Sequence, residues 1–491
     1  MLLVITGAIS VKVTPVYRSN LLCTIWFMDH LDEFLINREA NSIAPSIEFE
    51  GMNAFRFAIA GTLWGWNPES EIQPSGVVSN ENLEDFGFPT DLLSQINPEP
   101  LTQQIRRGVQ FCKENHQEWN SDNARIQTWR EISEGKELAA VFSFLISGIC
   151  SQFERESVAA AVALFNSMPL VEGDQSEIDP RRWRLWFNRP WAAPFFFHEK
   201  WMHPSVSFNE ERNEEELIEW QGKKWAEYCN RWVKYALASG TEWEIVGCAR
   251  LLARWRIEIG LQSTDSIVQE IASAVYLRPD GSDGPDGSDG SDGSDGPDGS
   301  DGPNGPNGPN GVSTIIHGTW GWKGDWWYPG KNNFHDYVKS NFRVNLYGQG
   351  MEFSWSGAYI KKQRVIGGER FQRWGATASN GNGLKSVFAH SYGSEIVARA
   401  VNLGMKVDEI IFLSAPIHQP HIDMCPKVTR VIDIRLRNDL VLLLARARQK
   451  FPNPSPANVI SYKINRPFWS HSASHDPDVW QTENIASHVN L

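Results

Sequence analysis

Two different spacings of apolar residues divide the chain. From residue 101 to residue 277 apolar side chains recur every three or four positions, which is the period of an amphipathic helix. After residue 312 they gather in short β-branched runs separated by longer helical stretches. That second pattern is typical of a parallel sheet with crossover helices. The sequence therefore predicts a mainly helical part followed by an α/β part.

The first part contains five predicted helices with almost no strand signal between them. We expect them at Glu137–Phe153, Glu154–Met168, Glu211–Leu237, Glu242–Ile259 and Ser266–Leu277. Residues 1–100 follow neither pattern clearly. Val4–Tyr17 has the composition of one or two short strands, and Leu83–Pro100 is rich in loop residues.

Two of the predicted helices share one residue pattern. The order E-x-E-x-V-x-x-A-x-x-L begins at Glu154 and again at Glu242, 88 residues later. This distance is about twice the ~40 to 47 residues of a HEAT or armadillo repeat. Small residues on both helices allow close approach of a neighbour, so the segment resembles a short, divergent HEAT-like array. An unrelated helical bundle is the alternative, because two copies also arise by chance.

Residues 279–311 consist of eleven triplets of the form Pro/Ser-Asp/Asn-Gly, with no apolar residue that could join a core. We interpret them as a flexible acidic spacer between two parts, residues 1–278 and 312–491. Glycine at every third position also suggests a trimerising collagen-like stalk. Eight uncompensated aspartates and only six prolines in this segment disfavour the stalk.

The α/β part contains six predicted strands separated by helices. The strands are expected at Val312–Ile316, Arg343–Tyr347, Leu384–Phe388, Glu409–Leu413, Val428–Leu436 and Asn458–Ile464. Between them, helices are predicted at Phe334–Phe342 and at Ser391–Leu403, where Gly404 ends the second helix.

A candidate nucleophile lies where the third of these strands meets a helix. Leu384–Phe388 runs into Ala389-His390-Ser391-Tyr392-Gly393 and then directly into the helix. A serine on so sharp a turn needs small residues two positions before and two after it, and Ala389 and Gly393 meet this need. The pentapeptide alone is a weak signal, but its place between strand and helix strengthens it.

Such a serine also requires hydrogen-bond donors for the oxyanion of the reaction intermediate. The backbone N–H of Tyr392, which follows the serine, is one candidate. The second is the backbone N–H of Thr319, because Ile315–Gly321 has the form of an H-G-x loop after an early strand. We expect His317 in this loop to brace it rather than to transfer protons.

The acid and the base follow later strands. Asp439 follows Val428–Leu436 after two intervening residues, whereas Asp433 lies inside that strand and is expected to be a packing or edge residue. The base is His471 or, as the alternative, His475. Asp476 and Pro477 are suited to begin a helix from Pro477 to Val489, which ties His475 to the helix entry and favours His471.

Residues 312–491 thus resemble a compact α/β-hydrolase of the bacterial esterase and lipase kind. The elbow around Ser391 and the terminal H-S-x-x-x-x-P-x-V-W segment carry most of the resemblance, and Ala389 departs from the usual glycine. The resemblance implies a serine hydrolase of carboxylic esters, acyl or lipid, with no metal or organic cofactor. Trp320 and Trp322 either line its substrate pocket or pack at an edge.

Composition limits the remaining interpretations. Eight of the thirteen net negative charges belong to the spacer, so the other residues carry only −5, which argues against nucleic acid as a partner. The six cysteines show no C-x-x-C spacing, which favours a reducing cytoplasm and leaves secretion open. The longest apolar stretch, Leu138–Cys150, has 13 residues, short of the ~20 that span a bilayer, so we expect no transmembrane segment.

The helical part has a candidate interaction surface. Arg181–Pro204 interleaves arginines with tryptophans and phenylalanines, which indicates either a surface for a protein partner or membrane interface, or ordinary packing of helices. Packing is the favoured interpretation. If the helical part were the working part, the protein would be a scaffold with a degenerate hydrolase domain. A thioesterase or a peptidase on the same fold is the other alternative.

Overall fold

A computed structural model gives the fold. It describes residues 47–64, 74–95, 101–114, 139–168, 214–240, 242–276, 311–319, 321, 324–331, 333–357, 361–464 and 470–491. Nearly all of these belong to one compact unit, residues 47–169 and 222–491, and the second unit comprises residues 1–46 and 170–221. Val4–Tyr17, Arg181–Pro204 and residues 279–310 of the spacer lie outside the described residues.

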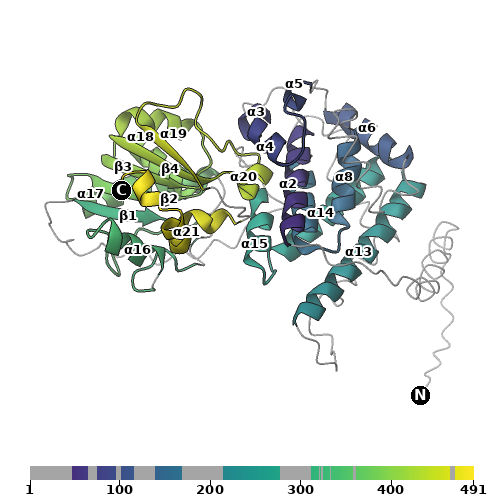
Figure 1. The fold of residues 1–491 in the computed structure, drawn as a ribbon, viewed down its shortest axis with the longest axis horizontal. Coiled ribbons are helices and arrows are strands. Elements are labelled where there is room, and N and C mark those ends of the chain that lie inside the picture. Colours follow the sequence, from purple (N-terminus) through teal and green to yellow (C-terminus); the bar gives the residue numbers. More distant parts are fainter. Residues whose placement is uncertain are drawn as a thin grey trace, which may run out of the picture. The chain divides into compact units, whose positions relative to one another are not determined.

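A parallel sheet of five strands forms the centre of the α/β part (Figure 1). The strands pair in sequence order, so their carboxyl ends meet at one edge, where ligands bind in sheets of this kind. They are β1 (Val312–Ile316), β2 (Leu384–His390), β3 (Val407–Leu413), β4 (Arg430–Leu436) and β5 (Val459–Ile464).

Helices cover both faces of this sheet (Figure 1). On one face Phe388, Ile411 and Ile432 pack with Phe334 and Trp480 in a single apolar cluster. That face carries α16 (Phe334–Asn341), α21 (Pro477–Thr482) and α22 (Ile485–His488). The other face carries α17 (Lys361–Ala378), α18 (Gly393–Asn402) and α19 (Gln419–Met424).

Two predicted elements of the α/β part differ from the structure. The predicted strand Arg343–Tyr347 contributes a single bridge, from Leu346 to Ser313, because Val344 is 76% exposed and does not pack on the sheet. The predicted helix from Pro477 to Val489 is broken into α21 and α22, since Asn484 adopts a left-handed conformation with φ of 49°. The other strands end within two residues of their predicted limits.

The helical part is built around one buried helix. Nearly every residue of α9 (Glu154–Ser167) is buried, and α9 packs against α2 (Ile47–Leu63), α8 (Ala140–Ile149), α14 (Glu242–Gly260) and α15 (Ser266–Ser273). In a HEAT array each repeat contacts only its neighbours. Among the described residues, the helices form a cluster around α9 instead, which favours the bundle alternative. The remaining helices are α3 (Pro74–Val77), α4 (Asn80–Asp85), α5 (Leu92–Gln95), α6 (Leu101–Glu114) and α13 (Glu214–Ser239).

Contacts across the spacer join the helical part to the α/β part. Helices α2, α9 and α15 pack against α20 (Leu440–Leu444), which follows β4. The Asn166 side chain donates to the Leu444 carbonyl at 2.7 Å, and Lys463 pairs with Glu81 at 2.9 Å. The apolar core therefore continues from one part into the other. No helix in the described part of the chain has the length and hydropathy needed to cross a membrane.

Candidate active site

Ser391 occupies a strained turn between β2 and α18. Its φ of 48° lies in the left-handed region, which is uncommon for a residue other than glycine. The Ser391 N–H donates to the Leu413 carbonyl of the neighbouring strand at 3.0 Å, and its own carbonyl accepts from the Ser394 N–H at 3.0 Å. Strain of this kind persists only where surrounding contacts hold it. The turn presents Ser391 at the carboxyl edge of the sheet.

Two glycines allow the loop after β1 to lie directly on this turn. A Cβ at Gly393 would stand 2.5 Å from the His317 carbonyl oxygen, and one at Gly318 would stand 2.7 Å from the Cβ of Ser391. Thr319 follows Gly318 in the same loop. The two predicted oxyanion donors, at Thr319 and Tyr392, therefore belong to the two segments that meet at Ser391. Trp320 and Trp322 lie outside the described residues.

His317 is buried inside this loop between two tryptophans. Its ring lies 4.7 Å from the ring of Trp327 and 5.8 Å from that of Trp355, centre to centre. The Trp355 indole N–H donates to the His317 carbonyl at 2.9 Å. Burial lowers the pKa of His317 to about 4. A neutral ring packed in this way fits the bracing role expected from the sequence.

The structure brings Asp439 and His471 together. Nδ1 of His471 lies 2.8 Å from Oδ2 of Asp439, and both side chains are buried. Asp439 is also the N-cap of α20, where its Oδ1 accepts from the Leu442 N–H at 3.1 Å. One carboxylate oxygen is thus fixed by the helix and the other faces the imidazole. Nε2 of His471 is buried without a hydrogen-bond partner among the described residues.

The pKa of His471 reflects opposing influences. Burial alone would lower it, but the charge of Asp439, the hydrogen bond to Asp439 and the charge of Glu270 raise it, and the net pKa is above its ordinary value. A raised pKa means that the two carboxylates stabilise the imidazolium. Stabilising that cation is what a general base requires when it takes up a proton.

His475 lies in different surroundings from His471. Its ring stacks on Trp326 at 4.0 Å and meets the ring of His390 edge-on at 4.6 Å. Burial, and to a smaller extent the charge of His471, lowers the pKa of His475 to about 3. The contacts described for His475 are with rings and none is with a carboxylate. Its geometry therefore suits packing better than proton transfer.

A buried polar network surrounds the start of α18, next to the turn at Ser391. Arg364 pairs with Glu395 at 2.9 Å, and its guanidinium lies 4.3 Å from the centre of the Tyr392 ring. The Ser394 hydroxyl lies 2.9 Å from Nε2 of His421. These residues pack around the first turn of α18. They hold the helix whose N-cap, Tyr392, directly follows Ser391.

Sequence reasoning missed two contributors to this region. Glu270, on α15 of the helical part, accepts a hydrogen bond from the His471 N–H at 2.8 Å. His390 is the last residue of β2, and its ring lies 4.8 Å from the ring of His471. The local sequence around Glu270 contains no motif that points to a site 201 residues later.

Asp433, expected to serve packing, forms a buried ion pair with Arg435.

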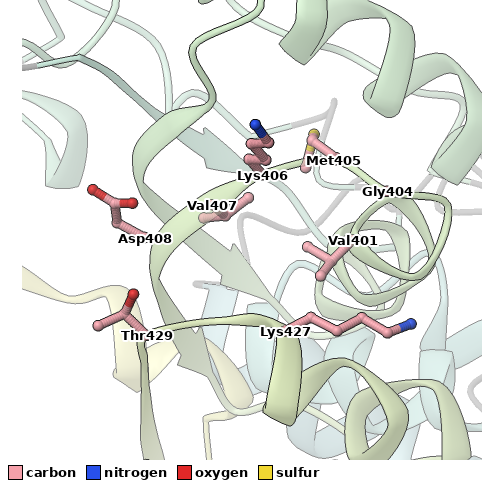
Figure 2. A pocket seen from close by; sticks show the side chains of 8 residues that line it. All are labelled: Val401, Gly404, Met405, Lys406, Val407, Asp408, Lys427 and Thr429. Atoms are coloured by element: carbon pink, nitrogen blue, oxygen red, sulfur yellow. The ribbon is translucent and has the colours of Figure 1, made fainter.

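A surface hollow of about 440 Å³ lies elsewhere, at the amino end of β3 (Figure 2). Lys406, Asp408, Lys427 and Thr429 surround it with parts of the loop before β3. Because Leu413, at the other end of β3, binds Ser391, the hollow lies at the opposite edge of the sheet. It takes no part in the candidate site.

No protein-family model, curated protein or solved structure matches this chain, so the site is judged on its own geometry.

Proposed function

We propose that the chain is a serine hydrolase of carboxylic esters that works through an acyl-enzyme on Ser391. The observation that carries this proposal is the 2.8 Å contact between His471 and Asp439 at the sheet edge that presents Ser391. The three residues follow three different strands in the order serine, acid, histidine. That order is the one used by α/β-hydrolases, and the parallel sheet with helices on both faces is compatible with that fold.

In the first step, the Ser391 hydroxyl attacks the ester carbonyl while Nε2 of His471 takes up its proton. The unpartnered Nε2 is available for this proton, and hydrogen bonds of this kind often tighten only when substrate binds. Asp439 keeps the proton of Nδ1 in place and stabilises the imidazolium. His471 then donates its proton to the departing alcohol, and water hydrolyses the acyl-enzyme by the same steps in reverse.

The negative charge that develops on the carbonyl oxygen needs two donors. The proposal assigns the N–H groups of Thr319 and Tyr392 to this task, because these residues flank the contact between Gly318 and Ser391. Donors built into the backbone are already oriented before the reaction. Their stabilisation of the transition state is therefore large.

Acyl or lipid esters are the substrates that the resemblance favours. The described surroundings of the site are rich in aromatic side chains, with Trp326 stacked on His475 next to the base. Thioesters and peptides remain alternatives on the same catalytic residues. A helical part that binds a partner or a surface is compatible with each of them.

The test is a substrate screen with the full chain. We expect turnover of p-nitrophenyl esters of at least one acyl length, no activity after Ser391→Ala, and wild-type activity after Ser455→Ala, which alters an exposed loop serine. A thioester and a peptide anilide are assayed in parallel to identify the bond. Activity of Ser391→Ala above a few per cent of wild type would contradict the assignment.

A further inference from the structure

Glu270 lies at the centre of a hydrogen-bond cluster that the catalytic proposal does not use. Its carboxylate accepts from the His471 N–H at 2.8 Å, from the Ser472 hydroxyl at 2.6 Å and from the Ser470 hydroxyl at 3.1 Å. Three consecutive residues of the loop that carries the base thus donate to one side chain. Glu270 itself belongs to α15, on the other side of the spacer.

These bonds replace a missing helix cap. His471 begins a short 3₁₀ helix, His471–His475, and Ser470 at its N-cap makes no capping bond to it. The first N–H groups of a helix require acceptors, which a preceding side chain normally supplies. Here the Ser470 hydroxyl donates to Glu270, and Glu270 accepts the N–H of His471. The position of the imidazole along the loop therefore depends on Glu270.

Capping, an ion pair and buried apolar residues hold helix α15, which carries Glu270. Asp265 caps α15 by accepting from the Ile267 N–H at 2.8 Å, and Arg155 of α9 pairs with Asp265 at 2.8 Å. Val268 and Ile271, on either side of Glu270, are buried. Helix α15 also packs against α20, the helix that Asp439 caps. Helix α15 therefore contacts both the helix that Asp439 caps and, through Glu270, the loop that carries His471.

We propose that Glu270 is a positioning residue of the active site, which fixes the loop of His471 from the helical part of the chain. This inference rests on the proposed function. It makes the helical part a structural component of the catalytic centre. The charge of the Glu270 carboxylate strengthens its hydrogen bonds, and a neutral side chain could not accept from all three donors.

The titratable groups around His471 define a specific readout. Asp439 faces it from the end of β4, Glu270 from α15, His390 from β2 and His475 from its own loop. The charge of Glu270 raises the pKa of His471. Removal of this charge therefore lowers the pKa of the base and moves the acid limb of the pH profile to lower pH. A purely structural role would not move it.

The experiment compares wild type, Glu270→Gln, Glu270→Ala and the control Glu258→Gln as full-length chains. Glu258 lies on α14 and forms a partly exposed pair with Arg254, so its change removes a negative charge of the helical part other than that of Glu270. For both Glu270 variants we expect kcat to fall by about 10²-fold, because a catalytic group misplaced by about 1 Å loses that much. KM should change little, and Glu258→Gln should match wild type.

The pH at which kcat/KM falls on the acid side does not depend on how much of the protein is folded. This pH therefore remains informative if Glu270→Ala folds poorly. The inference would be overturned if the Glu270 variants kept kcat within twofold of wild type. It would also be overturned if Glu270→Gln were less stable but its acid limb had not moved. The proposed function would stand in both cases. A wild-type chain that neither turns over esters nor reacts with a fluorophosphonate would overturn the proposed function and this inference with it.

Discussion

Two histidines four residues apart differ in every contact that matters for proton transfer. His471 faces Asp439 at 2.8 Å, whereas His475 stacks on Trp326 at 4.0 Å. We predict that His471→Ala lowers kcat on a small ester by about 10³-fold, the range of general-base catalysis. His475→Ala should lose about tenfold or less, because only packing is removed. The two variants are assayed side by side, and the reverse order would exchange their roles.

In the proposed mechanism, the pH dependence of the reaction follows from the pKa of His471. The base works when neutral, so kcat/KM should rise with pH through a pKa above the ordinary value of about 6.5. Asp439 contributes to raising this pKa, against the effect of burial. Asp439→Asn should therefore move the acid limb to lower pH and reduce kcat by about 10⁴-fold, because the imidazole loses its orienting partner. An acid limb that is unchanged in Asp439→Asn would contradict this account.

At the scale of elements, the contact between the β1 loop and the turn at Ser391 decides the geometry of the site. A Cβ at position 318 would stand 2.7 Å from the Ser391 Cβ and 3.1 Å from the His390 carbonyl oxygen, so one segment would have to shift. We predict a loss of about 10²-fold in kcat for Gly318→Ala. Gly348→Ala is the control, because a Cβ there meets nothing within 4 Å. Full activity of Gly318→Ala would show that the loop does not define the site.

The sequence predicted elements well where burial is local. Four of the five residues of Val312–Ile316 are β-branched, with Ser313 the exception, and the structure places β1 at the same limits. Arg343–Tyr347 contains only one β-branched residue, Val344, which is exposed, and no full strand forms there. Helix α2 was missed because its apolar residues lie on all sides, so it has no polar face to reveal a period.

The candidate site shows the same division between local and distant contacts. Ser391, Asp439 and His471 were predicted because each follows a strand, and parallel strands bring their carboxyl ends to one edge. Glu270 could not be predicted, because its contact with the loop of His471 depends on how α15 packs against α20. No pattern within either segment contains that information.

At the scale of the whole molecule, the contacts across the spacer change what the two parts can do alone. The two-part pattern of the sequence suggests that residues 312–491 could act by themselves. Without the helical part, however, α20 would lose α2, α9 and α15, and the loop of His471 would lose Glu270. The helical part should therefore be needed for activity as well as for the common core.

We predict that cleavage at a protease site inserted within the spacer leaves the two fragments associated and active. Gel filtration after cleavage should show both fragments in one peak with ester turnover retained. Residues 312–491 expressed alone should turn over esters at least tenfold more slowly, or fail to stay soluble, because they expose the surface of α20. Fragments that separate, with residues 312–491 fully active, would contradict the coupling of the two parts.

The central claim is that Ser391 is a nucleophile activated by His471 and Asp439. Its most direct test is reaction of the full chain with a fluorophosphonate, followed by mass spectrometry of the digested protein. The account predicts one adduct, on the peptide that contains Ser391, which is absent in Ser391→Ala and strongly reduced in His471→Ala. An unmodified wild-type chain, or an adduct on another residue, would contradict it.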